Sequence, residues 1–265
     1  MLNRLLITGA AGGLGKMARN RLGHLAQTLR LSDICEMAPA GSNEEVVTCD
    51  LGDRDAVMKL VEGCDGIVHF GGVSTEQAFD PILNANIAGV YNLYEAARAA
   101  GMPRILFASS NHTIGFYTQD QHLTVDMPTR PDSLYGVSKC FGEALASMYF
   151  DKFGLETAIV RIGSCFPEPK DHRMLATWMS EDDFVALIER VFTIPRLGCP
   201  VIWGKSANDR SWWDNSASEF MGWRPKDNAE TFASAMDERM ERPDRNAPEA
   251  RFQGGKFCAE PIYKD

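Results

Sequence analysis

A chain of 265 residues, 45% of them hydrophobic and 24% charged, has enough apolar material for one large folded domain, which excludes a disordered or fibrous protein. Its formal net charge of -9 argues against a protein that binds the phosphate backbone of nucleic acids. No apolar run approaches the ~20 residues of a membrane span.

The seven cysteines are scattered along the chain and form no Cys-x-x-Cys pair. This pattern argues against a disulfide framework or a zinc site and is typical of a reducing compartment. Residues 1–9 pass directly into an expected strand and turn, without the features of a signal peptide. We therefore expect a soluble cytoplasmic protein without a metal site.

A glycine-rich turn follows the first apolar run, residues 4–8, and precedes a helical pattern. Such a turn lets the backbone approach a pyrophosphate, and the helix N-terminus offers free N–H groups. The spacing is Gly-x-x-Gly-x-x-Gly rather than Gly-x-Gly-x-x-Gly, so a purely structural turn is the alternative. The residues expected to lie against a dinucleotide here are Gly9, Gly12, Gly13, Leu14 and Gly15.

The next expected strand, residues 28–32, ends at Asp33. A carboxylate at this place hydrogen-bonds the ribose hydroxyls of NAD and repels the additional phosphate of NADP. Residues 34–36 contain no Arg or Lys to receive such a phosphate. The sequence thus favours NAD, with a solvated turn aspartate as the alternative.

Further strands are expected over residues 46–49, 66–70, 104–109, 156–161 and 201–203. Asp50 and Leu51 follow the first of these and are candidates for contacting adenine, although Asp50 could equally cap the next turn. Phe70 ends the second, before two glycines where the backbone can run close to a cofactor. Asn86 lies on a helix expected over residues 81–99, and we expect it to face inward and contact the cofactor.

Strands therefore alternate with helices about every twenty to thirty residues. This rhythm predicts an α/β fold with a doubly wound parallel sheet, a Rossmann fold, whose ligands bind at the carboxyl ends of the strands. We expect a single domain. Residues 1–161 would form its NAD-binding core, and residues 162–265 would supply mainly substrate-covering segments and a C-terminal arm.

Tyr135 and Lys139 are a candidate proton acceptor and its neighbouring cation. They are four residues apart at the start of an expected helix, with Asp132 or Ser133 as its N-cap, so they share a face. A nearby ammonium favours the phenolate, and a general base works best when its pKa approaches the working pH. Tyr and Lys at this spacing also occur by chance on many helices.

Three polar residues follow the strand at residues 104–109. Ser110 could hold a reacting oxygen next to Tyr135. Asn111 and His112 come directly after it, and a single histidine at the start of a loop is more often a hydrogen-bonding or packing residue, or a substrate contact, than a group that transfers a proton.

Together these motifs resemble the short-chain dehydrogenase/reductase superfamily, in its extended, NAD-dependent epimerase/dehydratase-like branch. The matching segments are Thr8–Gly15, Asp50-Leu51, Ser109-Ser110, Tyr135-x-x-x-Lys139 and Met221–Pro225. Segments 108–116, 134–143, 161–165 and 212–216 are also similar to those of the bacterial uronate dehydrogenases. Members of that family oxidise the anomeric carbon of galacturonate or glucuronate with NAD, and their product is an aldarolactone.

The resemblance implies a role for each candidate residue. Tyr135 would take the anomeric hydroxyl proton, Lys139 would bind the nicotinamide ribose and lower the tyrosine pKa, and Ser110 would hydrogen-bond the reacting hydroxyl. The sugar hydroxyls or carboxylate would be held by Ser74, Asn111, His112 and Ser164, and the carboxylate would be clamped by Arg173. On the residues alone, an arginine in a polar loop is more often a solvated surface charge.

Two other functions are open from the sequence: a nucleotide-sugar epimerase or dehydratase with tightly bound NAD, and a non-catalytic NAD-sensing module. Only about 100 residues follow the strand at 156–161, which favours a free sugar acid over a nucleotide-sugar. The presence of Ser110, Tyr135 and Lys139 argues against a sensor, which needs no base. The resemblance also implies a homo-oligomer that associates through long helices.

Overall fold

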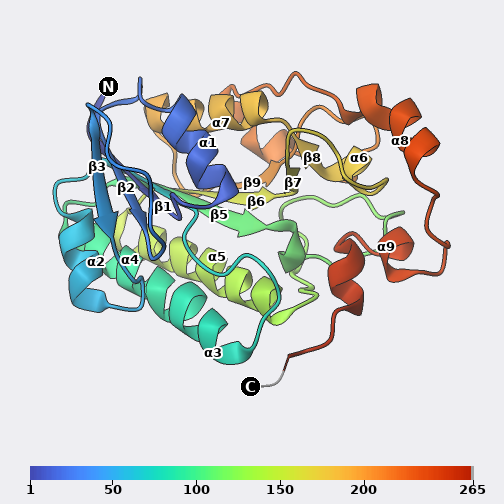
Figure 1. Cartoon of the computed structure of the whole chain (residues 1–265), viewed down its shortest axis with the longest axis horizontal. Helices are drawn as coiled ribbons and strands as arrows, with labels where there is room; N and C mark the ends of the chain where they lie inside the picture. The colour runs from blue at the N-terminus through green and yellow to red at the C-terminus, as the bar shows by residue number, and fades with distance from the viewer. Residues whose placement is uncertain (264–265) are drawn as a thin grey trace.

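The protein, described here by a computed structural model over residues 1–263, is built around a parallel sheet in the order β3-β2-β1-β4-β5-β6-β9 (Figure 1). Its strands are β1 (Leu2–Thr8), β2 (Ala26–Asp33), β3 (Glu44–Thr48), β4 (Gly66–His69), β5 (Arg104–Ser110), β6 (Thr157–Ile162) and β9 (Val201–Gly204). The strand order reverses between β1 and β4, where sheets of this kind bind ligands. The predicted doubly wound α/β fold is confirmed.

Helices cover both faces of the sheet (Figure 1). One face carries α1 (Gly13–Arg21) and α7 (Glu181–Thr193), and the other carries α2 (Arg54–Val61), α4 (Gly89–Ala99) and α5 (Leu134–Phe153). Each face has its own cluster of buried apolar side chains, because parallel strands are covered on both sides. The shorter elements are α3 (Phe79–Ile82), α6 (Met174–Thr177), α8 (Ala233–Arg239), α9 (Pro248–Arg251), and the two-stranded pair β7 (Ser164–Cys165) and β8 (Trp178–Met179).

Helix α5 carries the Tyr135–Lys139 pair, and it begins where the sequence predicts. Of the two expected caps, Ser133 is the N-cap, since its hydroxyl accepts a hydrogen bond from the Gly136 N–H at 2.9 Å. Gly154, with φ +77°, ends the helix in the left-handed conformation. The helix therefore starts beside the carboxyl end of β5.

The helix expected over residues 81–99 is not regular. A π-helical turn, Leu83–Ala88, separates α3 from α4. Asn86 lies in this turn, where its Oδ1 accepts from the Val73 N–H at 2.8 Å and its Nδ2 donates to the Val73 carbonyl at 2.9 Å. Periodicity alone does not reveal such a turn, because the apolar pattern continues through it.

The chain after residue 161 contributes to the sheet as well as to its surroundings. Strand β9 pairs with β6, and α7 packs on one face. Further on, residues 252–259 return to the segment after β5, with Phe252 bridging to Thr118. The division into core and substrate-covering parts stays a prediction. Within residues 1–263, no helix is both long and apolar enough to cross a membrane.

Candidate active site

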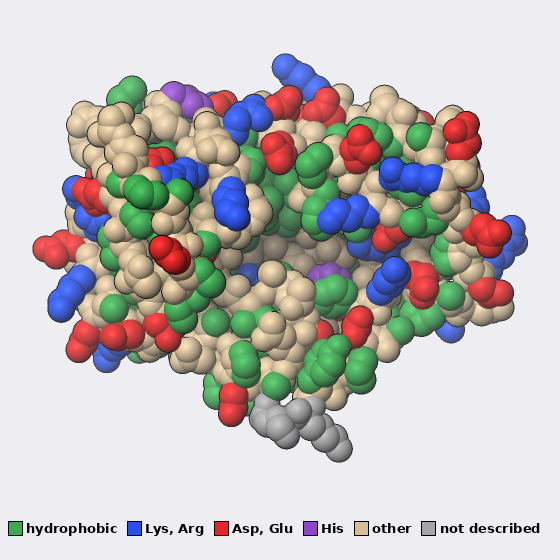
Figure 2. Space-filling view, viewed as in Figure 1, with side chains coloured by type: hydrophobic (Ala, Val, Ile, Leu, Met, Phe, Trp, Pro, Cys, Tyr) green, Lys and Arg blue, Asp and Glu red, His purple; other side chains and the backbone are tan. Residues whose placement is uncertain are grey.

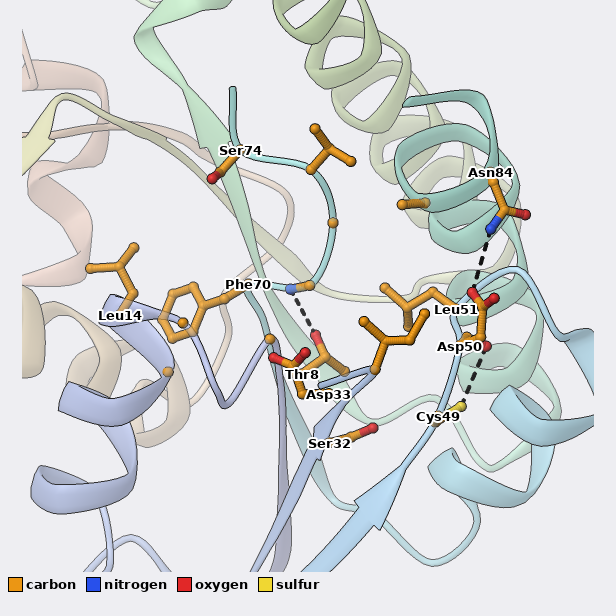
Figure 3. Close-up of a pocket in the computed structure, with 18 of the residues that line it drawn as sticks. Thr8, Leu14, Ser32, Asp33, Cys49, Asp50, Leu51, Phe70, Ser74 and Asn84 are labelled. Carbon is orange, nitrogen blue, oxygen red and sulfur yellow. Dashed lines mark hydrogen bonds between the residues drawn. The ribbon is translucent and has the colours of Figure 1, made fainter. Parts of the chain in front are cut away.

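A cavity of about 460 Å³ opens at the carboxyl ends of β1 to β4 (Figure 3). The residues predicted for a cofactor or substrate that line it are Gly9, Gly12, Gly13, Leu14, Gly15, Asp33, Asp50, Leu51, Phe70 and Ser74. In the space-filling view the molecule is hollowed near its middle, at the level where β5 ends, with Lys and Arg side chains at the rim (Figure 2). The motifs thus meet at one edge of the sheet.

The glycines of the first turn serve different purposes. Gly9 has φ +69°, and a Cβ there would lie 2.7 Å from the Phe70 carbonyl carbon. A Cβ on Gly15 would lie 2.1 Å from the Gly9 carbonyl oxygen, so this position sets the packing of α1. A Cβ on Gly13 would meet nothing within 4 Å. The first two positions shape the loop, and the third leaves space beside the cavity.

The N-terminus of α1 suits an anion. Within the described chain, α1 has no side-chain hydrogen bond at its N-cap and no acidic residue in its first turn. The first N–H groups of a helix lack intrahelical partners, and the helix dipole places positive charge there. A pyrophosphate in the cavity would meet N–H groups at Gly13 and Leu14, so the residues fit a dinucleotide.

Asp33 and Asp50 are held by backbone N–H groups at the cavity wall. Asp33 accepts from the N–H of Ala11 at 2.9 Å and from that of Cys35 at 3.0 Å. Asp50 accepts from the Gly52 N–H at 2.8 Å, so it caps the turn, as the alternative interpretation held, while it also lines the cavity (Figure 3). A carboxylate fixed at Asp33 disfavours an additional phosphate there.

Asn86 holds the loop that follows β4 and lines the cavity. Its amide hydrogen-bonds Val73 through both backbone groups and donates to the Ser138 hydroxyl at 2.9 Å. A Cβ on Gly72 would come within 2.5 Å of its Oδ1. This arrangement lets Asn86 support the loop after β4, and its direct contact with a cofactor stays a prediction.

Tyr135, Lys139 and Ser110 are brought together where β5 meets α5. The Lys139 Nζ donates to the Ala108 carbonyl at 2.8 Å and lies 5.6 Å from the centre of the Tyr135 ring. The Ser110 hydroxyl lies close enough to the Tyr135 phenol to lower its pKa. All three side chains are buried. Tyrosine and lysine therefore share one face of α5, as their spacing predicts.

Burial changes the proton affinity of both groups. It raises the pKa of Tyr135 to about 12, against the opposing effect of Ser110, and the Asp132 charge raises it further. Burial also lowers the pKa of Lys139 to about 8. The predicted lowering of the Tyr135 pKa is thus wrong for the chain by itself, because desolvation of the phenolate outweighs the opposing effect of Ser110.

His112 is fixed by a buried aspartate and covered by an aromatic ring. Its Nδ1 hydrogen-bonds Asp132 Oδ2 at 2.8 Å, and the Asp132 side chain is 0% exposed. A Cβ at either Gly115 or Gly254 would lie 1.8 Å from the same Asp132 oxygen, so both segments leave room for this carboxylate. The carboxylate orients the imidazole and leaves Nε2 for other contacts.

Two further contacts come from the residues that return from the C-terminal end of the chain. The Phe257 ring stacks on His112 with 3.8 Å between ring centres, and its centre lies 6.2 Å from that of Tyr135. The Asn111 amide donates to the Gln253 carbonyl at 3.5 Å. Residues near the end of the chain thus form part of the wall around the Tyr135 site.

Arg173 is half-buried, whereas an arginine in a polar loop is more often a solvated surface charge. Its Nη1 donates to the Gln253 carbonyl at 2.8 Å, and its Nη2 lies 3.5 Å from the Ser164 hydroxyl. Burial lowers its pKa. Among residues 1–263 no carboxylate lies within 4.0 Å of its guanidinium nitrogens. Among the described residues, this half-buried cation therefore forms no ion pair, although the charges of Asp171 and Asp132 act on it from further away.

Three contributors were missed from the sequence. Glu76 binds the first turn of α5, Asp132 orients His112, and Gln253 holds Arg173. Asp132 was considered only as a helix cap. The pair Gly254-Gly255 signals a close backbone approach, since Gly255 has φ +66° and a Cβ there would lie 2.7 Å from Arg173 Nε. Glu76 is a single acidic residue in a polar stretch, so the local sequence does not indicate its contact with α5.

The chain is similar to known proteins over most of its length. Residues 5–181 match the NAD dependent epimerase/dehydratase family. The chain is 63% identical to a uronate dehydrogenase of Agrobacterium fabrum, over 99% of both chains, and 57% identical to one of Pseudomonas putida, over 97% of this chain and 96% of the other.

Solved structures of a uronate dehydrogenase are also similar to this chain. The crystal structure of uronate dehydrogenase from Agrobacterium tumefaciens has a TM-score of 0.98 at 63% identity and covers 99% of both chains. A mutant of that enzyme complexed with NAD also has a TM-score of 0.98, at 62% identity and again over 99% of both chains. The dTDP-glucose 4,6-dehydratase DesIV from Streptomyces venezuelae, at 20% identity and a TM-score of 0.71 over 89% of this chain and 96% of the other, shares the fold.

The low pKa of Lys139 predicts a gain of stability at alkaline pH. Between about 8 and the ordinary value of 10.5, unfolded Lys139 holds a proton that the folded protein has lost, so the free energy of unfolding rises with pH. Relative to Lys139→Met, the wild type should gain about 2 kcal/mol between roughly pH 7.5 and pH 9.5. Urea unfolding at both values measures this, and parallel changes in the two proteins would contradict it.

Proposed function

The chain belongs to the NAD dependent epimerase/dehydratase family, and we propose that it oxidises the anomeric C1 of a free hexuronic acid, galacturonate or glucuronate, to the aldarolactone with NAD. Three uronate dehydrogenases are 52 to 63% identical over nearly the whole chain, which supports this substrate class. The structural observation that carries the proposal is the half-buried guanidinium of Arg173, which forms no ion pair within residues 1–263.

The cavity at β1 to β4 is the proposed NAD site. The N–H groups of Gly13 and Leu14 would bind the pyrophosphate, Asp33 the adenosine ribose, and Leu51 the adenine. Bound NAD supplies the nicotinamide ring that accepts the hydride from C1. The fixed Asp33 carboxylate favours NAD over NADP.

Arg173 and Ser164 form the proposed carboxylate site. A planar guanidinium can pair with both oxygens of a carboxylate. Partial burial disfavours an unpaired cation, and an arriving uronate carboxylate would offset part of that cost. A neutral sugar would leave the guanidinium unpaired. The site thus distinguishes sugar acids from neutral sugars by charge.

Tyr135 is the proposed acceptor of the anomeric hydroxyl proton. Ser110, which lies close to the phenol, would hold the same hydroxyl. Because burial raises the phenol pKa, the phenolate needs stabilisation, and protonated Lys139 is the cation of this chain that lies beside it. Ser74, Asn111 and His112 would contact the remaining sugar hydroxyls, with His112 presenting the orientation that Asp132 sets.

An assay on a panel of sugars tests the function. We expect the purified protein with NAD to form NADH with galacturonate or glucuronate but not with galactose or glucose, since the neutral sugars lack the carboxylate. Conversion of UDP-sugars without net NADH would favour an epimerase or dehydratase instead. NAD binding without turnover of any compound would contradict an enzymatic role.

Replacing Tyr135 by Phe removes the proposed base and keeps the ring. We expect kcat for the uronate to fall by roughly 100- to 10,000-fold, with the Kd for NAD changed less than about threefold, because the phenol acts in proton transfer. Steady-state kinetics and NAD titration measure the two effects. Tyr91→Phe, at an exposed position on α4, is the matched control, and near-normal turnover in Tyr135→Phe would eliminate the assigned base.

Replacing Arg173 by Ala removes the proposed carboxylate clamp. We expect KM for the uronate to rise about 100-fold, and Arg173→Lys to fall between, because lysine keeps the charge but not the planar pair of donors. Arg242→Ala is the control, since Arg242 is exposed and pairs with Asp237. Thermal melting verifies folding, and an unchanged KM in a folded Arg173→Ala protein would remove Arg173 from the site.

A further inference from the structure

Glu76 connects two parts of the site that are far apart in sequence. Its carboxylate accepts hydrogen bonds from the Leu134 N–H at 3.1 Å and the Tyr135 N–H at 2.9 Å, across 58 and 59 residues. The residue is 9% exposed. No Lys, Arg or His side chain within residues 1–263 forms an ion pair with it. Its charge is therefore compensated by backbone donors of α5.

The position of these donors explains why a carboxylate suits it. The first N–H groups of a helix have no intrahelical partners, and a negative charge is favourable at this end of the helix dipole. Ser133 accepts from Gly136, the third position, and Glu76 accepts from the two positions before it. One carboxylate with two oxygens thus completes the cap of the helix that carries Tyr135.

Glu76 also belongs to the loop between β4 and α3. In this loop Gly71, Gly72, Val73 and Ser74 line the cavity (Figure 3). Val73 is held through both backbone groups by Asn86, and Glu76 is held by α5. Ser74 therefore lies between two fixed points, one on each side in the chain. The loop cannot shift at Ser74 without breaking one of these attachments.

We propose that Glu76 is a positioning residue, which fixes the distance between the Ser74 hydroxyl and Tyr135 and so aligns the bound sugar with its base. This proposal rests on the proposed function, in which Ser74 contacts the sugar and Tyr135 takes the proton. Glu76 touches neither the substrate nor the cofactor in this scheme. Its own backbone belongs to the loop that carries Ser74, and its carboxylate binds the backbone N–H groups at the start of α5.

The test is a double-mutant cycle with Glu76→Gln and Ser74→Ala. Glutamine keeps the size of the side chain but offers one acceptor oxygen, and its NH₂ faces the second backbone N–H. We expect KM for the uronate to rise about tenfold in Glu76→Gln, with the Kd for NAD changed less than about threefold, because the pyrophosphate and adenosine sites lie elsewhere. In the Ser74→Ala background the same substitution should change KM less than about twofold.

Asp53→Ala is the control for loss of a helix cap. Asp53 caps α2 by accepting from the Ala56 N–H at 3.0 Å and is exposed, so its loss should lower Tm without changing KM or kcat. A Glu76→Gln protein that lowers Tm alone would overturn the proposal, as would equal effects on KM in the wild-type and Ser74→Ala backgrounds. Unchanged KM in Ser74→Ala itself would also overturn it.

Glu76→Asp repeats the cycle in case the glutamine protein does not fold. Its carboxylate is one methylene shorter and cannot reach both N–H groups with the backbone in place, so KM should again rise and again depend on Ser74. Additive effects would overturn the proposal. Failure of the proposed function is recognised separately, because the wild type would then form no NADH with any uronate.

Discussion

The placement of Tyr135 depends on a close contact between α5 and β5. A Cβ on Gly142 would lie 2.3 Å from the Phe107 ring, so only a glycine lets the helix lie this near the strand. The Lys139 ammonium and the Glu143 carboxylate then reach β5 directly, at the Ala108 carbonyl and the Ser109 hydroxyl. These contacts fix the helix in register with the strand whose end carries Ser110. A shift of one turn would separate the phenol from that hydroxyl.

The same burial that fixes these groups also sets their protonation. It raises the pKa of Tyr135 to about 12 and lowers that of Lys139 to about 8, and in both cases it favours the neutral form. Without bound ligands, the Tyr135 phenol therefore holds its proton more tightly than an exposed tyrosine does, and the Lys139 ammonium loses its proton more readily than an exposed lysine does. For Tyr135 to act as the proposed base, bound ligands would have to restore the charges that burial disfavours. Proton transfer by Tyr135 would then depend on the presence of these ligands.

Much of this arrangement could be predicted from the sequence, because it depends on local patterns. Buried strands read as apolar runs, Ser133 has the form of a helix cap, and Tyr135 and Lys139 share a face by their spacing alone. The rest depends on contacts between distant segments. Glu76 reaches α5 across 58 residues, and Gln253 reaches Arg173 across 80. The pKa of Tyr135 was mispredicted for a related reason, since spacing reveals the neighbouring charge but not the degree of burial.

In the proposed function, Arg173 would let a protein of acidic composition bind an acidic substrate. With a formal net charge of -9, the protein as a whole repels anions, so attraction has to be local. Partial burial reduces the screening of the Arg173 charge by solvent, and no carboxylate within residues 1–263 forms an ion pair with it, while Gln253 and Ser164 hold the guanidinium through neutral oxygens. Neutral acceptors orient the cation without cancelling its charge. A carboxylate in place of either one would also contact the guanidinium, but it would neutralise the charge that the proposed acidic substrate needs.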